Sequence, residues 1–284
     1  MKRAVALLTI LAAPPIVAQV PIEIAASGHA TVPVEGSFGV RQFVFDTGAE
    51  GSAVYADFAA AAGLKLVGSE ILQGQTGATD VAVVNLQSVT LDRVKKDWLT
   101  AIRLDRRADG VPLAGIVGID LFGDCIVDFN FPARRLALLP TGKPPVGLAS
   151  KPMRAIPTVG GLLTVPVRIG TARAVAVIDT GARKTRINGA LGRLLGIDPA
   201  TVAKGDVIQG ATNVAVDTGA GTVRNVLLGK RRLAAAPVLI ADLPVFDAFG
   251  VADRPAIILG LDWLTNTRLV VDFPARLVWF EAAQ

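Results

Sequence analysis

The sequence predicts an all-β protein made of two similar lobes, and three observations support this fold class. The chain has 284 residues, of which 51% are hydrophobic and 19% charged, enough for a substantial buried core. It also holds 29 Gly and 17 Pro, a composition that favours strands and tight turns over helical bundles. Finally, one motif occurs twice at the end of an apolar strand, with the same weaker matches after each copy.

The repeated motif is Asp-Thr-Gly-Ala, at residues 46–49 and again at residues 179–182. A hydroxyl residue follows each copy at the same offset, Ser52 in the first and Thr185 in the second. An aspartate at the end of an apolar strand is costly to bury unless it is hydrogen-bonded or takes part in chemistry. Its repetition with matching neighbours argues against chance.

The weaker matches extend the duplication over most of the chain, so the repeat is a whole lobe and not a short solenoid unit. Gly63 and Gly196 stand at the same distance after their aspartates. The other matching segments are 72–74 with 208–210, 116–120 with 258–262, 127–129 with 271–273, and 132–134 with 274–276.

The elements of the first lobe follow from local patterns. Alternating apolar residues around a Gly-containing turn predict a hairpin of strands 29–34 and 40–45, which delivers Asp46. A short strand at 52–54 precedes a helix at 56–62, stopped by Gly63. The remaining predictions are a Gly-rich turn at 73–77, strands at 81–91 and 98–104, a strand and helical turn at 115–120, and a hairpin of 125–129 with 136–139.

The second lobe is expected to begin again after a linker. Residues 141–157 contain four prolines and favour a linker. A strand at 163–169 and a second at 174–178 then deliver Asp179. The expected domains are an N-terminal lobe at 28–140, the linker at 141–157, and a C-terminal lobe at 158–284.

The N-terminus has the pattern of a secretory signal peptide. Lys2 and Arg3 precede an apolar run to Ala18 that is too short for a comfortable membrane span. We expect residues 1–18 to be removed and the protein to be exported, periplasmic or secreted; a retained anchor is the alternative. Cys125 is the only cysteine, so an intramolecular disulfide is excluded. A propeptide at 20–27 stays open.

The two Asp-Thr-Gly-Ala motifs, each followed by a hydrophobic-hydrophobic-Gly segment, resemble the aspartic proteases. The likeness is closer to the retropepsin-like branch than to the large pepsins, and it covers nearly everything after the leader. It implies the bilobal acid-protease fold, with two closed β-barrel-like lobes, short helices and a shared site under β-hairpin flaps. It implies no metal and no cofactor.

Carried over to matching positions, the resemblance gives each residue a role. The catalytic pair is Asp46 and Asp179, and Thr47 and Thr180 interlock the two loops. Gly48 and Gly181 allow close backbone approach, and Ala49 and Ala182 complete the loops. Gly118 and Gly260 lie in bracing strands. The flap residues are Gln73, Gly74, Gln75 and Thr76 in the first lobe, and Gln209, Gly210, Ala211 and Thr212 in the second.

Other candidate residues have simpler interpretations. Asp217 begins a third Asp-Thr-Gly-Ala, but it lacks the following hydroxyl residue and helix, so we interpret it as a turn or strand end. Asp120 and Asp262 precede short helices and are interpreted as N-caps. His29, the only histidine, is expected at the surface. Tyr55, the only tyrosine, follows the first catalytic loop, so neither flap has a matching aromatic residue.

The charge pattern and the duplication bear on partners. The basic clusters at 93–96 and 230–232 are short and lack interleaved aromatic residues, so they predict solvated turns and no nucleic-acid site. Arg183 and Lys184 indicate either lobe asymmetry or a preference for acidic substrates. We expect a peptide or protein substrate and a monomer whose lobes pair within one chain. The alternatives are a non-catalytic peptide-binding protein and an obligate homodimer.

Overall fold

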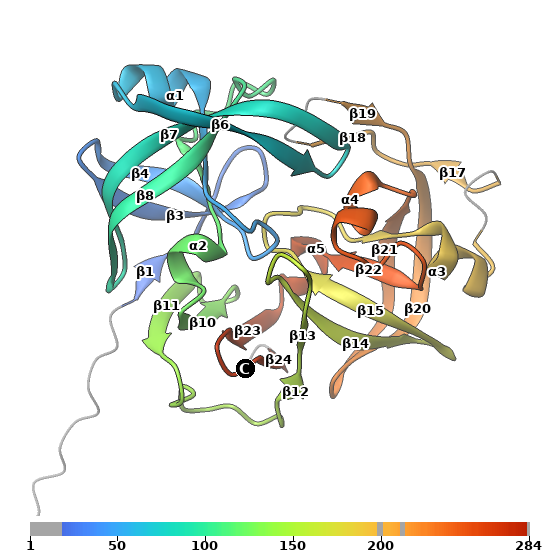
Figure 1. The fold of residues 1–284 in the computed structure, drawn as a ribbon. Helices are drawn as coiled ribbons and strands as arrows, with labels where there is room; N and C mark the ends of the chain where they lie inside the picture. Colours follow the sequence, from blue (N-terminus) through green and yellow to red (C-terminus); the bar gives the residue numbers. More distant parts are fainter. Residues whose placement is uncertain (1–18, 198–200, 211–213, 283–284) are drawn as a thin grey trace, which may run out of the picture.

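The computed structural model describes residues 19–197, 201–210 and 214–282. The chain forms two β-lobes that lie side by side, with a third sheet beneath their junction (Figure 1). Short helices lie at the edges of the lobes. The prediction of an all-β, bilobal acid-protease fold is confirmed.

The N-terminal lobe is a six-stranded barrel closed by pairing of Glu35 with Thr90. Around the ring its strands are β3 (Ala30–Gly36), β4 (Gly39–Phe45), β9 (Gly115–Val117), β5 (Ala53–Tyr55), β8 (Val94–Leu104) and β7 (Gly77–Leu91). The edges carry β2 (Glu23–Ile24) and β6 (Lys65–Gly74), and the helices are α1 (Ala56–Ala61) and α2 (Ile119–Phe122).

The C-terminal lobe repeats this ring and closes it by pairing Val167 with Leu228. Its strands are β14 (Leu163–Ile169), β15 (Ala172–Ile178), β22 (Ala256–Leu259), β16 (Arg186–Ile187), β21 (Arg231–Ile240) and β20 (Gly219–Leu228). The additional elements are β13 (Ile156–Pro157), β17 (Ala203–Lys204), β18 (Ile208–Gln209), β19 (Ala215–Val216), α3 (Gly189–Leu194), α4 (Pro244–Ala248) and α5 (Leu261–Leu264).

The third sheet takes strands from both lobes and joins them. Its order is β1 (Val20–Pro21), β11 (Arg135–Pro140), β10 (Cys125–Asn130), β23 (Thr267–Asp272), β24 (Leu277–Ala282) and β12 (Met153–Arg154). The two halves meet where β10 pairs antiparallel with β23. A hairpin from each lobe therefore becomes one continuous hydrogen-bonded ladder.

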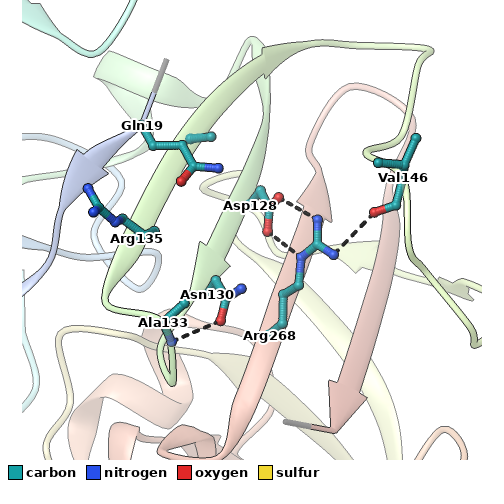
Figure 2. A pocket seen from close by; sticks show the side chains of 8 residues that line it. Gln19, Asp128, Asn130, Ala133, Arg135, Val146 and Arg268 are labelled. Carbon is teal, nitrogen blue, oxygen red and sulfur yellow. Dashed lines mark hydrogen bonds and ion pairs between the residues drawn. The ribbon is translucent and has the colours of Figure 1, made fainter. Parts of the chain in front are cut away.

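An ion pair on one face of this sheet also links the lobes. Arg268 of β23 donates from Nε and Nη2 to the two carboxylate oxygens of Asp128 on β10, at 2.8 and 2.7 Å (Figure 2). Arg268 also donates to the carbonyl oxygen of Val146, 3.2 Å away. Such two-pronged pairs fix orientation as well as distance. The pocket that surrounds Asp128 and Arg268 in Figure 2 therefore lies where strands of the two lobes meet.

An aromatic cluster anchors the strand that ends at Asp46. Phe45 is fully buried and stacks on Phe122 of α2 and on Phe129 of β10, with ring centroids 4.4 and 5.8 Å apart. Phe122 in turn meets Phe273, which follows β23, edge-on. Burying aromatic rings of this size supplies much of a core's stabilisation. The end of β4 is thereby fixed against both the helix and the shared sheet.

Strands occur in two segments that the sequence had left open or assigned to a linker. Residues 20–24 form β1 and β2, and Ile22 is buried, so the segment considered as a propeptide is part of the folded body. The end of the proposed linker forms β12 and β13; its Pro157 is tolerated because β13 is an edge strand. The expected signal peptide, residues 1–18, lies outside the described residues. Within the described part, no helix is long and apolar enough to span a membrane.

Candidate active site

The structure brings the two Asp-Thr-Gly loops together at the lobe junction. Asp46 follows β4 and Asp179 follows β15, and each strand pairs in parallel with a strand that ends beside its loop, β9 or β22. Asp46 is partly exposed, whereas Asp179 is only 3% exposed. Each carboxyl group is close enough to the other to influence its pKa. Each also accepts from its own loop, Asp46 from the Gly48 N–H and Asp179 from the Ala182 N–H, both at 2.7 Å.

The two threonines hold the loops together reciprocally. The Thr47 hydroxyl donates to the carbonyl oxygen of Ile178 (2.8 Å) and accepts from the Thr180 N–H (3.1 Å). The Thr180 hydroxyl donates to the carbonyl oxygen of Phe45 (2.7 Å) and accepts from the Thr47 N–H (3.0 Å). Both side chains are buried. Each hydroxyl thus satisfies two backbone groups across the lobe boundary.

The glycines of the loops are required by close packing against the opposite aspartate. A Cβ on Gly181 would lie 2.1 Å from Oδ2 of Asp46, and one on Gly48 would lie 2.5 Å from Cγ of Asp179. Real Cβ atoms do not approach so closely. Each carboxyl group therefore rests over the glycine of the other lobe, which brings the two aspartates face to face.

The environment shifts the ionisation of both aspartates. Burial raises the pKa of Asp46 well above its usual range, and the neighbouring Asp179 raises it further. Burial also raises the pKa of Asp179, but the nearby Arg186 guanidinium opposes that shift. Two carboxyls so close cannot both ionise easily, so the pair holds one proton over an extended pH range.

A second hydrogen-bonded layer braces each loop from behind. Asp120 accepts from the Ser52 hydroxyl (2.7 Å) and N–H (2.9 Å), and that hydroxyl accepts from the Gly118 N–H (3.2 Å). In the second lobe, Asp262 accepts from the Thr185 hydroxyl (2.7 Å) and N–H (2.9 Å), and that hydroxyl accepts from the Gly260 N–H (3.0 Å). The arrangement is therefore the same in both lobes.

These contacts correct two sequence-based interpretations. Asp120 and Asp262 are not N-caps, because Gly118 and Gly260 occupy the cap positions of α2 and α5 and neither helix has a side-chain cap. The two aspartates lie inside the first turns and bind the catalytic loops instead. Gly118 and Gly260 lie just after β9 and β22, where a Cβ would come within 2.7–2.8 Å of Ala49 or Ala182 carbonyl oxygens.

The predicted flap segments approach each other from the two lobes. In the first lobe β6 and β7 form a hairpin in which Gly74 pairs with Gly77, so Gln75 and Thr76 form its tip and Gln73 lies on its arm. In the second lobe β18, which contains Gln209, pairs with β19. A Cβ on Gly210 would lie 3.1 Å from the Thr76 hydroxyl, so the two segments touch. Ala211 and Thr212 lie outside the described residues.

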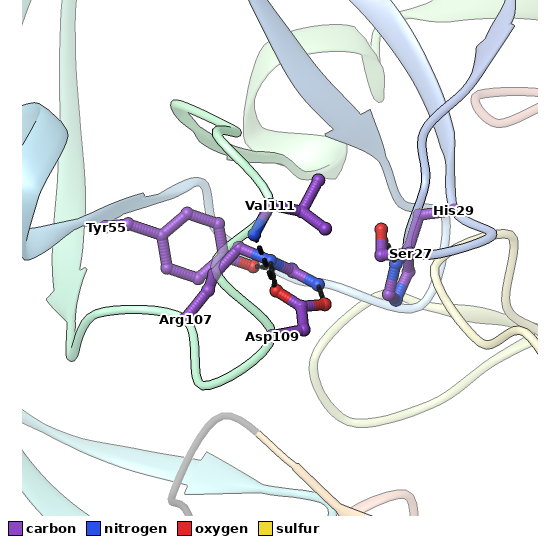
Figure 3. Close-up of polar contacts among 6 residues, drawn as sticks. All are labelled: Ser27, His29, Tyr55, Arg107, Asp109 and Val111. Atoms are coloured by element: carbon purple, nitrogen blue, oxygen red, sulfur yellow. Dashed lines mark hydrogen bonds and ion pairs between the residues drawn. The ribbon is translucent and has the colours of Figure 1, made fainter.

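A polar cluster beside the dyad was not foreseen from the sequence. The Tyr55 hydroxyl accepts from Arg107 (2.8 Å), and Arg107 forms an ion pair with Asp109 (Figure 3). His29, expected at the surface, is instead half-buried and contacts Ser27. Burial, Arg107 and Arg183 lower the pKa of His29 to about 4. This histidine is therefore neutral near pH 7.

Two remaining sequence-based expectations concern Asp217 and a metal site. Asp217 lies between β19 and β20, as expected for a strand end. Thr218 beside it donates to the carbonyl oxygen of Asp206. Among the described residues, no group of His, Cys, Asp and Glu side chains is arranged to hold a metal ion.

Two barrel lobes, each presenting one aspartate on an interlocked Asp-Thr-Gly loop, define the class of bilobal acid proteases. A comparison with protein families agrees: residues 30–121 and 165–263 match the aspartyl protease family, once in each lobe. The match covers more than half of the chain, and the protein therefore belongs to the aspartyl protease family. No individual curated protein matches the chain.

Proposed function

We propose that this protein is an aspartic endopeptidase that hydrolyses peptide bonds with a water molecule activated by Asp46 and Asp179. The observation that carries the proposal is the placement of the two carboxyls. They lie on loops locked together by four inter-lobe hydrogen bonds, and each rests on the glycine of the opposite lobe.

The chemistry follows from the shared proton. The ionised carboxylate takes a proton from water as the oxygen attacks the scissile carbonyl carbon, while the protonated partner donates its proton to the carbonyl oxygen. The resulting gem-diol collapses when the amide nitrogen is protonated and the C–N bond breaks. Neither a metal nor a covalent intermediate is needed. The touching hairpin tips, residues 75–76 and 210, hold the extended substrate over the dyad.

The active unit is proposed to be the monomer. Both aspartates, both threonines and both bracing carboxylates come from one chain. The shared sheet pairs β10 with β23 within that same chain. We further propose that residues 1–18 direct export and that the mature protein begins at Gln19, which N-terminal sequencing of the exported protein tests.

A peptide library tests the reaction. The leader-free protein is incubated with the library over a range of pH, and cleavage is followed by mass spectrometry. Asp46→Asn and Asp179→Asn should each abolish cleavage, and the double variant should be no worse, because the pair acts as a unit. Asp217→Asn is the matched control and should retain wild-type activity. Cleavage that survives in either dyad variant would contradict the assignment of Asp46 and Asp179. A wild-type protein that binds peptides but hydrolyses none of them would contradict the endopeptidase function.

A further inference from the structure

Arg186 is a buried cation without a hydrogen-bond partner for two of its donors. It is the first residue of β16 and is only 9% exposed. Within the part of the chain that the structure describes, its Nε and Nη1 have no acceptor, and no salt bridge involves it. The N–H groups of a buried guanidinium normally have hydrogen-bond acceptors, because a desolvated and unpaired charge in a protein interior costs roughly several kcal/mol.

The fold itself does not require this arginine. Arg186 pairs with Leu239 of β21 and Ile258 of β22. In the sister lobe the equivalent register is held by Ala53, which pairs with Ile102 of β8 and Ile116 of β9. The same strand position is thus built with a buried methyl group in one lobe and with an unpaired cation in the other. An energetic cost borne by one lobe alone points to a role outside folding.

The sheet register places Arg186 close to the strand that ends at the dyad: it pairs with Ile258 of β22, and Ile258 pairs with Val177 of β15, two residues before Asp179. The charge of Arg186 acts on Asp179 and Asp46, and it also reaches His29 of the other lobe. Arg183, three residues earlier, approaches the same N-terminal segment: a Cβ on Gly28 would lie 3.4 Å from Arg183 Cδ. The sheet register and these charge interactions therefore place Arg186 in the neighbourhood of the reacting carboxyls.

The groups around Arg186 leave its free donors available to an incoming anion. Burial lowers the pKa of His29 most, and Arg107, Arg183 and Arg186 lower it further, to about 4, so this histidine is neutral near pH 7. Among the described carboxylates near this cluster, Asp109 is already paired with Arg107. The Asp262 carboxylate accepts hydrogen bonds from the N–H and the hydroxyl of Thr185. The dyad, holding one proton, contributes a single negative charge. The acceptors near the dyad thus already have partners, whereas two donors of Arg186 have none.

We propose that Arg186 binds the carboxylate of a glutamate or aspartate side chain of the substrate next to the scissile bond, so that the protease prefers acidic peptides. This inference rests on the proposed endopeptidase function. The guanidinium offers a planar fork that matches a carboxylate. Its flexible aliphatic stem lets the head turn toward the bound peptide. Arg186 is then the specificity-determining residue, placed in only one lobe.

Matched peptide pairs test the proposal. A cleaved library peptide is resynthesised with Glu or Gln at each position in turn, and kcat/KM is measured for each pair. At one position, wild type should prefer Glu by roughly ten- to a hundred-fold, as for a charge-assisted hydrogen bond. Arg186→Gln should reduce that ratio to about one, and Arg186→Lys should keep part of it. Arg183→Gln removes the same charge at an exposed position and should preserve the ratio at high salt.

Two further measurements separate the possible failures. Binding of the Glu and Gln peptides to Asp46→Asn, alone and combined with Arg186→Gln, reports the same preference without hydrolysis, so a failed endopeptidase proposal does not hide the result. Arg186→Ala, which installs the sister-lobe residue, should unfold at the same or a higher urea concentration than wild type. The proposal is overturned by equal handling of Glu and Gln at every position. The proposal is also overturned if Arg186→Gln shifts the pH profile equally for the Glu and Gln peptides and leaves their kcat/KM ratio unchanged. Strong destabilisation of Arg186→Ala overturns it as well.

Discussion

Replacing Thr180 with valine, which exchanges a hydroxyl for a methyl group, should strongly destabilise the protein. Valine keeps the shape of the side chain but removes the hydroxyl that donates to the Phe45 carbonyl and accepts from the Thr47 N–H. Thr180 is fully buried, so water cannot replace the lost partner. Each orphaned buried group costs about 1–3 kcal/mol, which for two groups gives a loss of roughly 2–6 kcal/mol. The total free energy of unfolding of an ordinary domain is about 5–15 kcal/mol, so this loss would be a large part of it.

The assay is urea unfolding of Thr180→Val beside Thr180→Ser. Serine retains both hydrogen bonds and removes one methyl, a change worth about 0.8 kcal/mol. Thr47→Val should behave like Thr180→Val, because its hydroxyl serves the Ile178 carbonyl and the Thr180 N–H in the same way. A valine variant within about 0.5 kcal/mol of its serine counterpart, a difference typical of unimportant surface changes, would refute this account of the junction.

Three further predictions concern the dyad and its supports. Because the folded-state pKa of Asp46 is raised, its contribution to stability is full below the unfolded value near pH 3.9 and is lost as pH rises through the folded value. Asp46→Asn should therefore gain thermal stability over wild type as pH rises above about 4, and a difference that stays constant with pH would contradict this. Asp262→Ala should lose about 1–3 kcal/mol and most activity, since it leaves the Thr185 donors unpaired, whereas Asp262→Asn should be milder. Ala49→Ser with Ala182→Ser should move the alkaline limb of the pH–rate profile down by about one unit for each hydroxyl that donates to the ionised dyad, and an upward shift would exclude that donation.

Much of the fold is predictable because its signals are local. The apolar strands that end at Asp46 and Asp179 are β4 and β15. Gly63 and Gly196, expected after short helices, both adopt the left-handed conformation that glycine tolerates, with φ of +61° and +69°. Duplication then supplied the second lobe from the first. The shared sheet was not foreseen, since pairing of β10 with β23 is a contact between distant segments that leaves no local pattern.

The site was predictable where it is symmetric and missed where side chains depart from symmetry. Ser52 and Thr185 stand at the same offset after their catalytic aspartates, and Asp120 and Asp262 end the matching segments 116–120 and 258–262, but each of these two aspartates was interpreted from its neighbouring helix alone. Arg186 carries a signal too, a charge in a strand position where the other copy has alanine. The Arg107 cluster had no such signal, because its meeting with Tyr55 depends on how the loop after β8 folds back.

The dyad combines a symmetric frame with an asymmetric environment. The frame treats the two aspartates alike: each has an N–H donor at 2.7 Å, a glycine beneath it and a braced loop behind it. The surroundings do not, because Asp179 has the Arg186 cation nearby whereas Ala53 occupies the equivalent position beside Asp46. A nearby cation favours the ionised form of a carboxyl group, so Arg186 opposes the rise that burial causes in the pKa of Asp179. The duplicated residues build a symmetric pair, and Arg186, which stands where the first lobe has Ala53, makes the surroundings of the two aspartates unequal.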